Sequence, residues 1–361
     1  MPDPRVEIAW WPSTRIQELQ SFIDSEWKAG HILSTDEVLL RWQHPRSDDE
    51  ISVVGATEDG HLVGILGVIP VEICLRGDRV PGGWLTTWIV TPPARRRRVG
   101  LRLLEFVLER HEFVGTIGAN ATTMKILGAL RFHTGSAVPR WVRPIREDAL
   151  ERLVGAGFEL PAPAAGGGHT PVTHATPVRD WSPELGTQWD DVWSRQIAPE
   201  IVGTWRDAAY LDWRYVSHPR YRYRIRVGED RHGRPSALLV HRTESVQGAD
   251  ANVLRVVEAI GDAAALTRLV HDLAEIGHEE EAAFADFYCT GERYGRALED
   301  GGFVPEGSLP VSLPSRFQPL EPGSRPLTAA LRLMSRTNGD DLFAGDDVYF
   351  TRSDCDQDRP S

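Results

Sequence analysis

The sequence predicts an α/β chain of the α+β kind, built from two tandem units that each form a mixed, mostly antiparallel sheet flanked by helices. The length of 361 residues suits two domains of about 150 to 180 residues. Strand and helix patterns alternate along the chain, and the series starts again after a segment rich in Pro, Ala, Gly and Thr. We therefore expect a first domain at 1–159, a linker at 160–177 and a second domain at 178–361.

The first half opens with helical patterns and continues with hairpins around the turns Asp59-Gly60 and Arg76-Gly77. A strand, helix, strand, helix series follows, in which Leu103, Leu104 and Val107 recur at helical spacing. The predicted strands are 51–56, 62–70, 71–75, 84–90 and 114–118, and the predicted helices are 16–28, 35–43, 99–111 and 122–130.

The second half repeats this order. Trp42 and His44 precede the first hairpin, and Trp213 and His218 precede the second with a wider spacing. The predicted strands are 221–227, 236–241, 253–259 and 283–289, and the predicted helices are 263–276 and 293–299. We interpret this as two copies of one unit; the alternative is that two α/β domains share common local patterns.

Composition limits the class of protein. A hydrophobic content of 41% and a charged content of 25% are typical of a soluble globular chain. No apolar run approaches about 18 residues, and the start lacks the form of a signal peptide, so we expect a cytoplasmic protein without a membrane partner. Three scattered cysteines predict neither a metal site nor a disulfide framework, and a net charge of -12 disfavours nucleic acid.

The most informative segment is 88–104, in which an apolar strand ends at Pro92-Pro93, four arginines follow, and an apolar helix begins. A strand, a cationic turn and a helix N-terminus place unpaired backbone N–H groups and the positive end of the helix dipole at one point. This pattern predicts a pyrophosphate cradle. The alternative is a solvated arginine-rich turn, since arginine is overused throughout the chain.

The same segment resembles the acetyl-CoA loop of the GCN5-related N-acetyltransferase (GNAT) family, with Val90, Pro92, Arg95 and Gly100 in register and Arg98 in place of the first glycine. The resemblance implies two tandem GNAT-like domains and a co-substrate that is acetyl-CoA or another short acyl-CoA, with no metal. The residues that it assigns to the cofactor are Trp88, Ile89, Val90, Arg95, Arg96, Arg97, Arg98, Val99, Gly100 and Asn120.

A second family motif is only partly present. Asn120 is in place, Leu127 stands where the family has the tyrosine often proposed to protonate the thiolate, and Arg131-Phe132 replaces Gly-Phe. By resemblance Asn120 contacts the cofactor, but it could equally cap a helix, and the two roles are compatible.

Direct acyl transfer needs a polarised thioester, a neutral amine and a proton carrier. Thr86 and Thr87 lie beside the expected thioester, so we expect one hydroxyl to face the acceptor cleft between the two copies. His133 is the first choice as proton carrier because it follows the second motif and because histidine is the residue type best suited to exchange protons near neutral pH. His31 and Glu72 are weaker candidates.

The second copy has Gly261-Asp262 where the first has its arginine turn, so we expect one CoA per chain and a degenerate second site. The C-terminal residues 346–361 contain a short strand followed by Asp354, Asp356 and Asp358. A solvated acidic terminus is the simpler interpretation of this tail, and a contact with a cationic acceptor or a metal is the alternative.

The implied reaction is N-acylation of a primary amine. A weaker resemblance to tandem acetyltransferase-like proteins of bacterial polysaccharide biosynthesis suggests an amino sugar carried on a nucleotide as the acceptor. An aminoglycoside, an amino-acid or thiol precursor and a protein N-terminus remain open. Two other classes are a non-catalytic CoA-binding scaffold or sensor, and an aminoacyl-tRNA-dependent transferase, which the negative charge disfavours.

Overall fold

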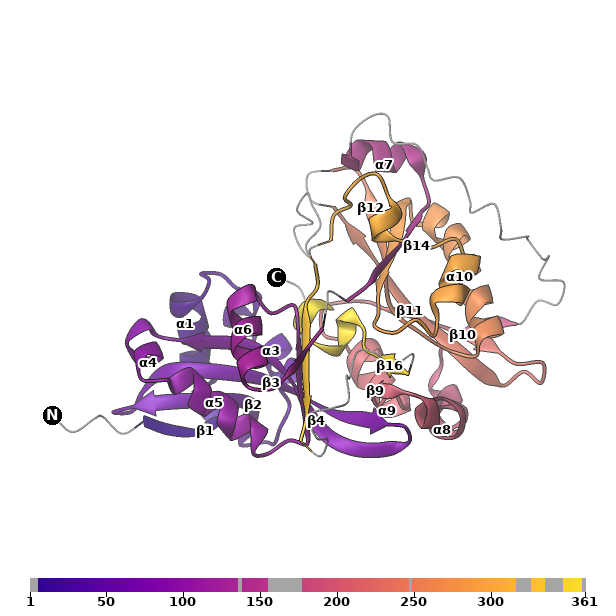
Figure 1. The fold of residues 1–361 in the computed structure, drawn as a ribbon. Helices are drawn as coiled ribbons and strands as arrows, with labels where there is room; N and C mark the ends of the chain where they lie inside the picture. The colour runs from indigo at the N-terminus through magenta and orange to yellow at the C-terminus, as the bar shows by residue number, and fades with distance from the viewer. Residues whose placement is uncertain are drawn as a thin grey trace.

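The computed structural model describes residues 6–135, 138–154, 177–246, 249–315, 326–334 and 347–358. Two lobes are visible, each a sheet with helices against it, and the C-terminal segment runs between them (Figure 1). The predicted fold class is confirmed. The predicted linker, except for Pro177, lies outside the described residues.

The first sheet has nine strands among the described residues, and its main path runs β1-β2-β3-β4-β5-β15-β6. Neighbours in the first four are antiparallel, whereas β4 and β5 are parallel. β9 pairs with the far end of β3, and β16 pairs with β9. The strands are β1 (Val6–Pro12), β2 (Glu50–Glu58), β3 (His61–Leu75), β4 (Asp78–Val90), β5 (Phe113–Ile117), β6 (His133–Thr134), β9 (Val202–Thr204), β15 (Ala329–Leu333) and β16 (Val348–Tyr349).

The second sheet has seven strands in the described part of the chain, ordered β14-β7-β13-β12-β11-β10-β8. Its one parallel pair is β12 with β13, which corresponds to β4 with β5 in the first sheet. The strands are β7 (Arg140–Pro144), β8 (Val178–Asp180), β10 (Arg224–Glu229), β11 (Pro235–Ser245), β12 (Asn252–Gly261), β13 (Ala282–Tyr288) and β14 (Val304–Pro305).

The helices cover these sheets. In α5, Leu103, Leu104 and Val107 form the buried stripe that the sequence predicts, and α10 buries a longer stripe of the same kind. The α-helices are α1 (Ile16–Glu26), α2 (Ile32–Thr35), α3 (Glu37–Gln43), α4 (Pro92–Arg96), α5 (Val99–Leu108), α6 (Ala121–Ala129), α7 (Glu147–Val154), α8 (Gly186–Val192), α9 (Ala208–Leu211), α10 (Ala263–Glu279) and α11 (Gly295–Asp300). No helix in the described ranges combines the length and apolar character of a membrane span.

The two sheets exchange strands across the expected boundary between the domains. β7 precedes the predicted linker yet pairs with β13 and β14 of the second sheet. In return, β15 comes late in the chain yet lies between β5 and β6 of the first sheet. Figure 1 shows this exchange as the magenta α7 on the orange lobe and a golden strand against the purple lobe. The division into 1–159 and 178–361 therefore does not separate the sheets.

The repeated Trp and His residues meet where the two copies touch. The Trp42 and Trp213 rings stack with centroids 5.4 Å apart, and each indole N–H donates to the backbone oxygen of the other residue, at 3.1 and 3.3 Å. His218 packs edge-on against Trp42, with centroids 4.3 Å apart. This reciprocal contact supports the interpretation of the chain as two copies of one unit.

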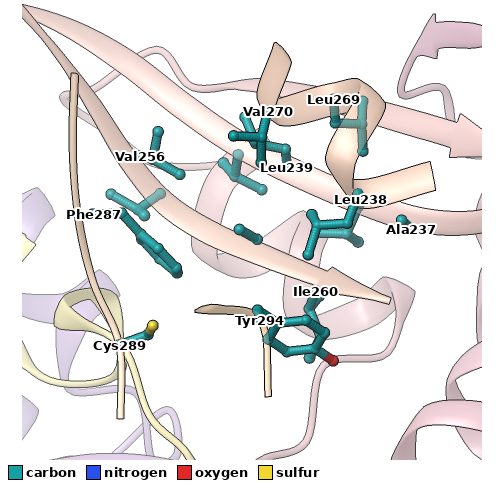
Figure 2. Close-up of a cluster of buried hydrophobic side chains, with 14 of the residues drawn as sticks. Ala237, Leu238, Leu239, Val256, Ile260, Leu269, Val270, Phe287, Cys289 and Tyr294 are labelled. Carbon is teal, nitrogen blue, oxygen red and sulfur yellow. The ribbon is translucent and has the colours of Figure 1, made fainter. Parts of the chain in front are cut away.

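Apolar packing is dense in the second lobe. Figure 2 shows side chains of β11, β12, β13 and α10 filling the space between them, among them Leu239, Val256, Val270 and Phe287. These side chains are at most 3% exposed. A rigid core of this kind fixes where β12 and β13 separate.

Candidate active site

The cradle segment forms a short helix, a tight turn and the start of a longer helix. Arg98 precedes α5 in a left-handed conformation, with φ 58° and ψ 26°, and no side chain caps the N-terminus of α5. Left-handed backbone costs a residue other than glycine about 1 to 2 kcal/mol. Arg98 thus keeps the backbone shape that a glycine would give, and the helix N-terminus stays open to an anion.

The four arginines of the cradle segment have different partners. Arg95 donates to the Val90 oxygen at 2.7 Å, while the side chains of Arg96 and Arg98 are exposed. Arg97 instead forms a two-pronged ion pair with Glu58, and its guanidinium holds the pKa of that carboxyl below its usual value. The structure therefore gives Arg97 a structural role and leaves Arg96 and Arg98 as the side chains available to a phosphate.

Gly100 lies in the first turn of α5 against the end of β4. A Cβ at this position would lie 3.3 Å from the indole nitrogen of Trp88 and 3.5 Å from Val90 Cγ2. The backbone of α5 thus approaches β4 closely. A larger residue here would push the helix N-terminus away from the strand end.

β4 carries a bulge at the two threonines. Leu66 pairs with Trp88 and Val68 pairs with Leu85, so that Gly67 alone faces both Thr86 and Thr87. The hydroxyl oxygens of both threonines are buried and have no hydrogen-bond partner. Buried polar atoms without partners are rare, and here two of them lie next to each other at the bulge.

β4 and β5 separate next to this bulge. Their parallel pairing ends at Trp84 and Gly115, and from Leu85 onward no described strand pairs with the β5 side of β4. The Thr116 hydroxyl donates to the Leu85 oxygen at 3.1 Å, and the Cys355 thiol lies 3.4 Å from the same oxygen. This separation of two parallel neighbours is called a splay below, and the C-terminal segment borders it.

The second copy has the same splay, but the chain's own side chains fill it. The pairing of β12 with β13 ends at Val256 and Phe287, and β12 bulges at Val257. Glu258, with no exposed surface, accepts from Arg206 at 2.8 Å and from Tyr215 at 2.9 Å. The Tyr349 and Ser353 hydroxyls of the C-terminal segment lie within 3.2 Å of backbone oxygens of β12.

The charges in this filled splay are fully buried. Arg206 pairs with Glu258 and with Asp354, both at 2.8 Å. Burial opposes charge on Arg206, but the two carboxylates outweigh it and hold the pKa of Arg206 well above its usual value. Burial raises the pKa of Glu258.

The N-terminus of α10 is also closed. The Asp262 carboxylate accepts from the backbone N–H groups of Ala264 and Ala265, at 3.0 and 3.1 Å. In the first copy the corresponding helix, α5, has no such cap. A pyrophosphate at α10 would have to displace a carboxylate of its own charge.

The C-terminal tail is not a solvated acidic terminus, and this expectation was wrong. Asp354 is 2% exposed and pairs with Arg206, while Asp358 has no exposed surface and pairs with Arg242 at 3.1 Å. The tail packs against the second lobe because the buried arginines there need carboxylate partners. The described residues hold no cluster of three or more His, Cys, Asp or Glu side chains that could bind a metal.

The predicted proton carriers are not gathered at the bulge. His133 lies on β6, and β5 and β15 separate it from β4, a distance of roughly 14 Å at three strand spacings. His31 is 4% exposed and caps α2, its Nδ1 accepting from the Leu33 N–H at 3.2 Å. Asn120 caps α6 by accepting from Thr122 and Thr123, which confirms the capping role.

Sequence reasoning missed His44. It is 1% exposed, its Nδ1 lies 2.9 Å from the Val68 oxygen, and its Nε2 lies 3.0 Å from Gln43 Nε2. A Cβ on Gly67 would collide with Thr86 Oγ1 and lie 3.0 Å from His44 Cε1, so His44 adjoins the bulge. The repeated Trp and His pattern could have found it, but that pattern was interpreted only as a sign of duplication.

A hollow of about 290 Å³ lies between the two halves. It is lined by Pro70, Val71, Glu72 and Arg79 of the β3–β4 hairpin and by Trp205, Asp207, Ala209, Tyr210 and Trp213. The acceptor cleft was expected next to the strand 84–90, but Trp84 at its start is fully covered and packs against Phe350 of the C-terminal segment. The hollow is thus displaced along β3 from the expected place.

Comparison with known proteins agrees with this geometry. Residues 33–116 match the family model described as Acetyltransferase (GNAT) domain, a range that includes the cradle, the bulge and the splay. The search of curated protein sequences gave no match.

Solved structures resemble the chain over nearly its whole length. A GCN5-related N-acetyltransferase from Anabaena variabilis is 11% identical, with a TM-score of 0.56 over 92% of this chain and 73% of that one. One from Kribbella flavida is 15% identical, with a TM-score of 0.51 over 91% and 71%. The N-myristoyltransferase of Saccharomyces cerevisiae, solved with bound myristoyl-CoA, is 13% identical, with a TM-score of 0.52 over 92% and 84%. At these identities the likeness shows the fold.

Proposed function

We propose that this chain, which has the GNAT fold, transfers an acyl group from acyl-CoA to a primary amine. The observation that carries the proposal is the combination, in one copy alone, of an uncapped helix N-terminus with a bulged and splayed strand. The family match over residues 33–116 supports it, because it covers that copy's site.

The residues of the first copy fit an acyl-CoA. The N–H groups at the start of α5 and the exposed Arg96 and Arg98 would hold the pyrophosphate. The unpaired side of β4 would guide the pantetheine arm toward the bulge, where the unpartnered hydroxyls of Thr86 and Thr87 would bind near the thioester. Donors aimed at the carbonyl oxygen would stabilise the negative charge that develops there.

The transfer needs no further reactant. The amine nitrogen forms a bond to the thioester carbon, the carbon–sulfur bond breaks, and the CoA thiolate takes up a proton while the new amide loses one. Co-substrates of this class range from acetyl-CoA to long-chain acyl-CoA; we propose acetyl-CoA, and a myristoyl-CoA complex is among the similar folds.

A second candidate is a non-catalytic acyl-CoA sensor. It is favoured by Leu127, which is fully buried where the family has a tyrosine hydroxyl, and by the distance of His133 from the bulge. A sensor binds acyl-CoA but releases no free thiol when an amine is added. The two candidates therefore differ in one measurement.

The test is an assay of CoA thiol release with acetyl-CoA and myristoyl-CoA against a panel of amines. The panel includes a nucleotide-linked amino sugar, the acceptor that the polysaccharide resemblance suggests, together with an aminoglycoside, simple amines and a peptide with a free N-terminus. We expect amine-dependent thiol release that the Gly100→Glu variant loses. Tight acyl-CoA binding without thiol release for every amine would favour the sensor.

A further inference from the structure

The C-terminal segment carries three carboxylates at alternate positions, and two of them pair with buried arginines of the second lobe. Asp354 pairs with Arg206 at 2.8 Å, and Asp358 pairs with Arg242 at 3.1 Å. Asp356, between them in the chain, belongs to neither pair and is partly exposed. Both ends of this stretch are therefore fixed to the second lobe, while its middle carboxylate has surface that a ligand can reach.

The two chain neighbours of Asp356 contact the first sheet at its splay. The Leu85 oxygen of β4 accepts from a hydroxyl of β5, so it points into the splay. The Cys355 thiol lies 3.4 Å from that oxygen. A Cβ on Gly118, the residue after β5, would overlap the side-chain amide of Gln357. Residues 355 and 357 thus lie against β4 and the end of β5, with Asp356 between them.

The contacts also limit how far the Asp356 carboxylate lies from the splay. Its Oδ1 lies 3.6 Å from the Cys355 sulfur, which lies 3.4 Å from the Leu85 oxygen, so Oδ1 is at most about 7 Å from that oxygen. The Gln357 amide donates to the same Oδ1 at 2.8 Å and orients it. An amine bound to this carboxylate would lie within reach of a thioester at the start of the splay, since reacting atoms meet at about 3 to 3.5 Å.

Asp356 approaches the splay from the face of the sheet opposite α5. Trp84 and Leu85 are adjacent in β4, so their side chains point to opposite faces. Leu85 packs with Leu103 of α5, whereas Trp84 belongs to the apolar cluster that includes Cys355. An acyl-CoA with its pyrophosphate at the N-terminus of α5 would leave the face away from that helix for the acceptor. The C-terminal segment borders this face.

Two other groups near the splay are less suited to take a proton. Burial raises the pKa of the Cys355 thiol well above its usual value, so the thiol stays protonated at neutral pH. His44 is 1% exposed, and its ring nitrogens lie 2.9 and 3.0 Å from other protein groups. Asp356 combines a carboxylate, exposed surface and a place at the splay.

We propose that Asp356 binds the acceptor amine at the splay and takes the proton that the nitrogen loses as the amide forms. This inference rests on the proposed function, since it assigns a residue to that reaction. The nitrogen bonds to the thioester carbon, its surplus proton passes to the Asp356 carboxylate, and the carbon–sulfur bond breaks. A carboxylate suffices because the nitrogen becomes acidic once it is bonded to that carbon. Asp356 then gives the proton to water, and the CoA thiolate takes one from water.

The first test is thiol release by Asp356→Asn, which keeps the shape of the side chain and removes its charge. For the amine that the unaltered chain acylates, we expect kcat to fall about 100-fold while CoA affinity and the urea midpoint stay unchanged. Asp48→Asn, at an exposed carboxylate between α3 and β2, is the matched control and should change none of these. A kcat that falls no further in Asp356→Asn than in the control would overturn the assignment and leave the proposed function standing.

The second test locates residue 356 without turnover. In Asp356→Cys the new thiol should displace bromide from bromoacetyl-CoA and form a thioether, which intact mass measures. The unaltered chain and Asp48→Cys should stay unmodified, because Cys74, Cys289 and Cys355 are buried. An unmodified Asp356→Cys that still binds CoA would overturn the assignment. Modification of Asp356→Cys, with no thiol release by the unaltered chain for any amine, would contradict the proposed function and the proton role together.

Discussion

The two copies share a bulged, splayed strand followed by a helix, but they differ in the side chains at the bulge and at the helix N-terminus. In the first copy the helix N-terminus is uncapped and two threonine hydroxyls at the bulge have no partner. In the second, Asp262 caps the helix and Glu258 fills the splay with partners from the C-terminal segment. The comparison teaches that one backbone arrangement can carry an uncapped helix in one copy and a capped helix with a filled splay in the other.

The C-terminal segment links the two splays. Tyr349 and Ser353 lie in the second, and Cys355 borders the first. One stretch of chain therefore fills the second splay and borders the first.

Removing the buried guanidinium should have the largest effect. Arg206→Met leaves Glu258 and Asp354 buried without their cation, which should lower the free energy of unfolding by about 3 to 5 kcal/mol. Urea denaturation measures the loss. Arg195→Met removes an exposed pair with Asp191 and should cost less than about 1 kcal/mol. Equal losses in the two variants would contradict the account of the second splay.

Blocking the cradle should come next. Gly100→Glu adds a carboxylate and bulk beside Trp88, and we expect CoA affinity to fall about 100-fold, or about 2.7 kcal/mol. The matched control is Ala264→Glu, an exposed position in the first turn of α10, which should bind CoA as the unaltered chain does. Calorimetry decides the outcome, and a similar loss in both variants would place CoA somewhere else.

Low pH should lower the free energy of unfolding through two buried histidines of the second half. Burial lowers the pKa of His218 to about 3 and that of His241 to about 3. Both histidines are neutral when folded, whereas unfolded they take up protons below about pH 6.5. Stability therefore falls as pH drops from about 6.5 toward 3, by up to about 1.4 kcal/mol per pH unit for each histidine. Urea midpoints measured between pH 7 and 5 should fall less steeply for His241→Leu; an unchanged slope would exclude His241 as a cause.

Removing the N-terminal cap of α10 should have the smallest effect. Asp262→Ala removes the cap of α10 and should cost about 1 kcal/mol of stability. It should create no second CoA site, because Glu258 and Tyr349 still fill the splay. The measurement is a CoA titration of the variant. A second binding event there would show that the cap alone closes the site.

The sequence predicted the parts that local patterns encode. The strand, cationic turn and helix at 88–104, the cap at Asn120 and the absence of an arginine turn at Asp262 all depend on neighbouring residues. The bulge at Thr86 and Thr87 was not predicted, because a bulge depends on the register of β3 against β4.

The rest depends on contacts between residues far apart in the chain. Cys355 reaches Leu85 across 270 positions and Asp354 reaches Arg206 across 148. No local pattern reports such pairs, so the tail was predicted to be solvated. The exchange of β7 and β15 between the sheets was missed for the same reason, as was the distance of His133 from β4.

The most direct test of the central claim is the number of CoA molecules that one chain binds. Isothermal titration of the full chain with CoA should give one site, because an uncapped helix N-terminus and unpartnered hydroxyls at the bulge occur together only in the first of the two described copies. Two equivalent sites per chain would contradict the difference between the copies on which this account rests.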